Sequence, residues 1–157
     1  MSAQGYILGP TEGEHLIRSG AASTGAASGG SLCVKVDPSR GSDHMSLGTQ
    51  VLPKGVGIRV HQHLGADEVL FILEGHGFGI LGDTRTPIEK GSAVYVPKGV
   101  WHGVDNPDSE LTLLWVVAPP GLEELFRAIG SAPGAPPKQF TFEQLNEIAA
   151  KHQQQFR

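Results

Sequence analysis

The chain has 157 residues, the length of one domain, and its 39% hydrophobic and 18% charged residues are globular values. A formal net charge of −4 and the lack of a run of lysine or arginine argue against the basic surface that nucleic acid binding requires. The 22 glycines and 11 prolines are many for a helical protein but natural for strands joined by tight turns, so the composition predicts a β fold.

The N-terminal residues, the apolar stretches and the single cysteine together predict the cellular compartment. Cys33 has no other cysteine to pair with in the chain, and we expect it to be a buried thiol on a strand. Residues 1–10 have neither the basic nor the apolar region of a signal peptide, and no stretch approaches the roughly 20 apolar residues of a membrane span. These features predict a cytoplasmic protein that does not contact a membrane.

The first third of the chain predicts short antiparallel strands, because short apolar runs alternate with glycine and serine. The runs are residues 6–8, 15–18, 32–36 and 45–52. Between the second and third runs, residues 19–31 are almost wholly Gly, Ala, Ser and Thr. This segment predicts a mobile loop or a closely packed turn, and it is too short for a domain linker.

The middle of the chain predicts the main part of a β-barrel. Glycine-rich turns separate apolar runs at the even spacing of an all-β barrel. The five strands expected in this region are residues 57–63, 68–73, 77–81, 93–96 and 111–118.

Two helices are predicted after the last strand. Residues 121–130 have apolar side chains at helical spacing and end in glycine, and a second helix should run from about residue 142 to the C-terminus. Thr141 and Gln144 form a capping-box pattern at the start of the second helix. Its apolar stripe predicts packing on the barrel or on a partner subunit, and consists of Leu145, Ile148, Ala149, His152 and Phe156.

Two segments hold three histidines and one glutamate at spacings that suit one metal ion. The first contains, in order, Gly55, His61, His63, Glu68 and Gly75, and the second contains Gly91, Pro97, Gly99, His102 and Asn106. Residues two apart on a strand point to one side, so Arg59, His61 and His63 should face the same way. A short turn would bring Glu68 beside them, and His102 would arrive from a separate hairpin.

Imidazole and carboxylate ligands suit first-row divalent metals, in this case Zn, Fe, Cu, Ni or Mn. With one carboxylate the complex would keep about one net positive charge, which favours anionic or chelating oxygen ligands. A six-coordinate ion would also have two open positions, where substrate and dioxygen or water could bind.

Other side chains are weaker candidates for the site. Arg59 could pair with Glu68, hold an anionic substrate, or be a solvated arginine at the rim. Aromatic residues on barrel strands usually belong to the core, and some can line a cavity. The aromatic candidates for binding substrate are Phe71, Tyr95, Trp101 and Trp115.

Both segments match, position for position, the paired motifs of the cupin superfamily. The match covers residues 55–106, a stretch of 52 residues, and departs from the pattern at none of the histidine and glutamate positions. The chain thus resembles a small single-domain cupin, and the sequence after the last strand resembles quercetin-dioxygenase-like cupins.

The resemblance implies an all-β, jelly-roll barrel, commonly dimeric, with both helices packed outside it. The chain length and the order of the expected elements predict one domain over residues 1–157, with the barrel core at about 31–118 and the helical extension at about 121–157. The resemblance also implies one divalent metal ion on His61, His63, Glu68 and His102, with Glu68 exchanging between metal ligand and proton acceptor during catalysis.

The reaction is open between three hypotheses, because cupins with this ligand set catalyse several reactions and others only bind ligands. The leading one is a quercetinase-like dioxygenase acting on a small aromatic or enolic substrate that chelates the metal. The second is a redox-silent isomerase, cyclase or lyase. The third is a module that binds a small molecule without turnover.

Overall fold

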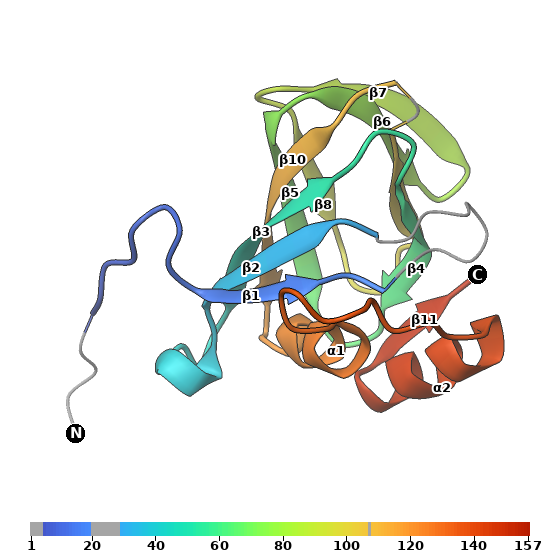
Figure 1. Ribbon diagram of the computed structural model, residues 1–157. Coiled ribbons are helices and arrows are strands. Elements are labelled where there is room, and N and C mark those ends of the chain that lie inside the picture. Colours follow the sequence, from blue (N-terminus) through green and yellow to red (C-terminus); the bar gives the residue numbers. More distant parts are fainter. Residues whose placement is uncertain (1–4, 20–28, 107) are drawn as a thin grey trace.

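The computed structural model describes residues 5–19, 29–106 and 108–157, which form two antiparallel sheets and two helices (Figure 1). The first sheet has the strand order β1 (Glu14–Ile17), β2 (Ser31–Val36), β3 (Ser46–Leu52), β10 (Leu111–Ala118), β5 (Asp67–Glu74) and β8 (Ala93–Val96). The second has the order β11 (Gln154–Phe156), β4 (Ile58–His63), β9 (His102–Asp105), β6 (His76–Leu81) and β7 (Thr84–Glu89). Within the described ranges the sheets are not closed into one barrel, and the fold is an open jelly roll.

The core lies between the two sheets and follows the alternation expected of strands. On β10, Leu111, Leu113, Trp115 and Val117 are buried, whereas the residues between them are half-buried. Trp115 pairs with Gly48 on β3, where a Cβ atom would lie 2.4 Å from the indole ring. Glycine at position 48 therefore allows the largest buried side chain to pack flat against its neighbouring strand.

Most predicted strands are confirmed, with four differences in the described part of the chain. Residues 6–8 form no strand, and β7, β9 and β11 were not predicted. β7 escaped prediction because five of its six residues are exposed and it contains a proline, so it carries no apolar alternation. Most of the glycine- and alanine-rich segment, residues 20–28, lies outside the described residues. Cys33 is a buried free thiol on β2, as predicted.

Both helices lie at one end of the sheets (Figure 1). α1 (Leu122–Ile129) buries Leu122 and Leu125 against the core, and α2 (Phe142–Lys151) buries Ala149. The predicted capping box is present: the Thr141 hydroxyl accepts from the Gln144 amide at 3.2 Å, and the Gln144 side chain accepts from the Thr141 amide at 2.9 Å. Neither helix has the length and hydrophobicity to cross a membrane.

The predicted extent of the second helix was wrong. The helix ends at Lys151, Gln153 has a φ of 56°, and residues 154–156 turn back as β11 to pair with β4. The unpaired backbone groups at the edge of β4 gain hydrogen bonds from this pairing, which outweighs the helical preference of the last residues. Phe156 therefore belongs to the sheet and not to the stripe of α2.

Candidate metal centre

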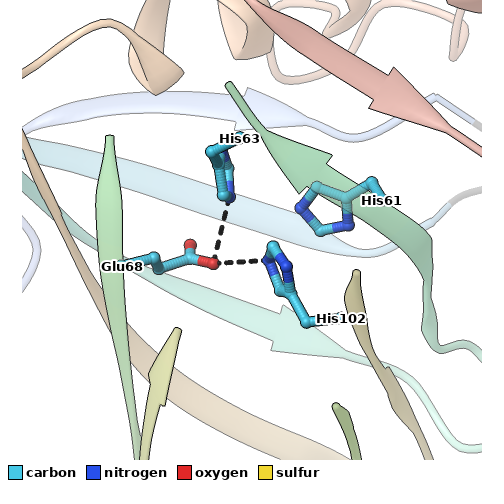
Figure 2. A group of neighbouring side chains, drawn as sticks. All are labelled: His61, His63, Glu68 and His102. Carbon is cyan, nitrogen blue, oxygen red and sulfur yellow. Dashed lines mark hydrogen bonds and ion pairs between the residues drawn. The ribbon is translucent and has the colours of Figure 1, made fainter. Parts of the chain in front are cut away.

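Three strands bring all four predicted ligands together. His61 and His63 lie on β4, His102 begins β9, and Glu68 is the second residue of β5. All four are buried, and one ligand atom from each lies within 4.8 Å of the others. Figure 2 shows Glu68 approaching the three imidazoles from the opposite side.

The two-sheet topology creates this arrangement. The histidines belong to the second sheet, where His61 pairs with His102, whereas Glu68 belongs to the first sheet. The turn before His102 is tied to β4 by a hydrogen bond of 2.7 Å from the Gly99 amide to the His63 carbonyl. Gly99 has a φ of 77°, a left-handed conformation that glycine adopts without strain. The cluster thus joins the two sheets at the end where the helices lie.

Backbone carbonyls fix the tautomers of two of the histidines. Nδ1 of His61 lies 2.9 Å from the Arg59 carbonyl oxygen, and Nδ1 of His102 lies 2.9 Å from that of Val100. A carbonyl oxygen can only accept a hydrogen bond, so Nδ1 carries the proton in both rings. The Nε2 lone pairs of the neutral rings are then directed into the cluster, as metal ligation requires.

Glu68 makes the cluster a cation site. Its Oε2 lies 2.9 Å from Nε2 of His102 and 3.2 Å from Nε2 of His63 (dashed in Figure 2). A neutral His102 with its proton on Nδ1 and an ionised Glu68 place two acceptors face to face, which only a shared cation satisfies. That cation is either a proton on the imidazole or a metal ion between the two groups, so these residues fit a metal.

The electrostatics favour the protonation states that a metal needs. Burial lowers the pKa of His61 well below its usual value, and the neighbouring His102 and His63 lower it further, so this imidazole is neutral. Burial alone would raise the pKa of Glu68, but the contacts of its carboxylate with Nε2 of His102 and of His63 outweigh this effect and hold the pKa well below the usual range. The cluster thus presents an ionised carboxylate and a neutral imidazole.

A small, mostly apolar cavity lies beside the cluster. His61, Glu68 and His102 form one wall. Apolar side chains from the first sheet, α1 and β11 form much of the rest, among them Leu70, Leu122, Leu125, Phe126 and Phe156. The Phe156 ring lies 5.5 Å from that of His61. Sequence reasoning missed most of this wall because it comes from α1 and the C-terminal strand β11, outside the metal motif.

Two polar residues of the cavity, Arg18 and Gln50, were also missed. Gln50 shares the buried face of β3 with Gly48 and Leu52, and a polar residue at an inward position of the alternation was the available signal. Arg18 directly follows β1 and has no comparable signal in the sequence.

The five predicted substrate-binding side chains do not line this cavity. Arg59 is exposed, with its guanidinium carbon 5.2 Å from the centre of the Phe142 ring on α2. Phe71 and Tyr95 are exposed because the inward positions of β5 and β8 belong to Leu70, Ile72 and Val96. Trp101 is half-buried under Arg157, and Trp115 packs in the core against Phe126. A role for these five in binding substrate stays a prediction.

Comparison with known proteins identifies the family. The family model of the cupin domain matches residues 48–119, which include all four residues of the cluster. The uncharacterized protein SCO3923 of Streptomyces coelicolor is 35% identical over 77 residues, which are 49% of this chain and 72% of that protein. The chain is a cupin. The uncharacterized protein MJ1618 of Methanocaldococcus jannaschii is 31% identical to this cupin over 61 residues, 39% of the chain, and the match spans about half (49%) of that relative.

A solved structure supports the fold. The crystal structure of an RmlC-like cupin from Shewanella frigidimarina superposes on this cupin with a TM-score of 0.61. The alignment covers 79% of this chain and 99% of that one at 17% identity, so the likeness concerns the fold alone.

Proposed function

We propose that this cupin is a metal-dependent dioxygenase that acts on a small aromatic or enolic substrate. The observation that carries the proposal is the buried set of three histidines and one glutamate opening on a mostly apolar cavity. His61, His63, Glu68 and His102 would hold one divalent ion of Fe, Ni, Mn, Cu or Zn. When bound, such an ion supplies Lewis acidity and, if it is redox-active, a site for dioxygen chemistry.

The residues of the chain have separate roles in this proposal. The apolar walls hold the body of the substrate and limit the access of water. Glu68 lines the cavity and is ionised, so it is in the state that can accept a proton from a substrate hydroxyl. The backbone bonds of His61 and His102 keep their rings in one orientation throughout.

The first experiment is elemental analysis of the protein purified without added metal, paired with oxygen uptake on flavonols and smaller enolic aromatics. A redox-active metal together with uptake supports the dioxygenase. Zinc at full occupancy without uptake would replace it with a redox-silent isomerase, cyclase or lyase, or with plain ligand binding.

Glu68→Gln separates metal binding from proton transfer. The substitution keeps the shape and a neutral oxygen ligand but removes the charge, so metal content should fall modestly while turnover is almost lost. A Glu68→Gln protein that loads metal and turns over normally would remove Glu68 as the base.

We also propose a cytoplasmic homodimer with a small-molecule substrate and with neither a nucleic acid nor a membrane partner. Light scattering on the purified protein tests the oligomeric state, and a mass of one chain would contradict the dimer.

A further inference from the structure

A positively charged side chain shares the cavity with the metal cluster. Arg18 follows β1 directly and lines the same cavity as His61, Glu68 and His102, among leucine and phenylalanine side chains. Burial lowers the pKa of Arg18 to about 10, so the guanidinium is still charged at neutral pH. The cavity is therefore apolar except for the cluster, this cation and Gln50.

Neutral groups hold the guanidinium in place. Nη1 of Arg18 donates to the Gly29 carbonyl oxygen at 2.8 Å. With its amide oxygen turned toward Arg18, Gln50 accepts from Nε at 2.8 Å and from Nη1 at 3.0 Å. These bonds fix the orientation of Arg18 but leave its charge unbalanced.

No carboxylate in the described part of the chain balances that charge, since no Asp or Glu there forms an ion pair with Arg18. Residues 20–28, which follow closely in the chain, are all Gly, Ala, Ser or Thr and have no carboxylate to offer. Glu68 lines the same cavity, but its charge is directed to His63 and His102.

A partly buried cation without a counter-ion is costly unless an anion binds beside it. We propose that Arg18, oriented by Gln50, is the specificity-determining residue that binds the carboxylate of a small organic acid in this cavity. The cavity is small and mostly apolar, which suits a short aliphatic or enolic acid. The inference rests on the proposed function only for the other end of the acid, at which the reaction takes place. There a second oxygen atom of the acid would face the metal cluster.

The test compares butanoate with butanamide, which have similar shapes and differ in charge. Affinities are measured by NMR titration at constant ionic strength, on protein stripped of metal by a chelator and on zinc-loaded protein. The wild type should bind butanoate about tenfold or more tightly than butanamide in both forms, since hydrogen bonds to a charged group are the strong ones. In the metal-free protein, where no metal ion can attract the carboxylate, Arg18→Met should bring this ratio close to one.

Arg59→Met is the matched control, because it removes the arginine that the sequence suggested for holding an anion but that lies outside the cavity. It should keep the full preference for butanoate. If Arg18→Met does not fold, Arg18→Lys is measured instead. A lysine cannot reproduce the planar fork of arginine, so the preference for butanoate over butanamide should fall several-fold.

A wild type without preference for the acid, or an Arg18 variant that keeps the full preference, overturns the inference. The measurement on metal-free protein tests the role of Arg18 separately from the proposed function. Missing metal or oxygen uptake would defeat the dioxygenase while the acid preference of the stripped protein stands, whereas a lost preference beside normal uptake defeats the role of Arg18 alone.

Discussion

Two clusters of charged side chains in this molecule balance their charges in different ways. On α1, Arg127 contacts Glu14 of β1, Asp37 after β2, and Glu124 one turn earlier in the helix. In the metal centre, three imidazoles surround the single carboxylate of Glu68. In the Arg127 cluster a donor faces acceptors, whereas in the metal centre acceptors face one another.

This difference in charge balance indicates a structural role for the Arg127 cluster and a functional role for the candidate metal centre. The Arg127 cluster satisfies itself and joins α1 to the first sheet, so its value lies in stability. The candidate metal centre needs a cation to become satisfied, and a position beside a cavity is typical of a functional site. Substitutions in one cluster should therefore change stability, and substitutions in the other should change metal binding.

The largest effect is expected from His102→Ala. Loss of a partner outside the ligand shell costs about 10–100-fold in metal affinity, and loss of a ligand should cost at least as much. The measurement is metal per protein after dialysis, with circular dichroism to show that the fold persists. His76→Ala, an exposed histidine outside the cluster, is the control. Normal occupancy in His102→Ala would disprove the assignment of the site.

Arg127→Met should lower the free energy of unfolding by about 2–3 kcal/mol, because Asp37 is only 1% exposed and would lose its charged partner. Urea denaturation measures the change, and metal content should be that of the wild type. A variant that loses metal but not stability would reverse the roles of the two clusters.

The Arg127 cluster also predicts a pH dependence. Burial alone would raise the pKa of Asp37, but the hydrogen bonds from Arg127 and Ser39 outweigh it and lower the pKa. The ionised carboxylate is thus favoured by folding, so its contribution is complete above the unfolded value of about 3.9 and is lost as the pH falls through the folded value.

Asp37→Asn cannot titrate at this position. The difference in unfolding free energy between wild type and Asp37→Asn should therefore shrink below about pH 4. Urea denaturation at neutral and acidic pH measures it, and a difference that stays constant would contradict the role of the carboxylate.

The smallest effect is expected from Lys90→Met. Lys90 pairs with Glu74 at 2.6 Å, but both side chains are 67% exposed, so the free energy of unfolding should change by less than about 1 kcal/mol. A loss as large as that in Arg127→Met would show that burial does not explain the contrast between ion pairs.

The four candidate metal ligands were predictable because part of the signal is local. His61 and His63 are two apart on a strand and share a side, and glycine and proline mark the turn that delivers His102. The same alternation rule misplaced Arg59. It lies two residues before His61 and was expected on the same side, but its side chain reaches Phe142 on α2. Alternation along a strand predicts the side from which a side chain leaves, but not where the end of a long side chain lies.

The remaining elements of the site depend on contacts between distant segments. The sequence of α2 continues as a helical pattern, and only the free edge of β4 makes residues 154–156 a strand and brings Phe156 beside His61. Arg18 is likewise separated from Gln50 and Glu68 by long stretches of chain, and the first sheet brings it to the cavity.

By itself the sequence determined the β fold, the helix starts and the shared face of His61 and His63, because each rests on spacing within one strand, turn or cap. Its resemblance to cupins added the jelly-roll class and the set of four candidate metal ligands. Only the tertiary structure decided which side chains form the cavity wall, how the chain ends, and that the buried cation beside the cluster is Arg18. These features arise from pairing and burial between segments far apart in the chain, for which local periodicity has no signal.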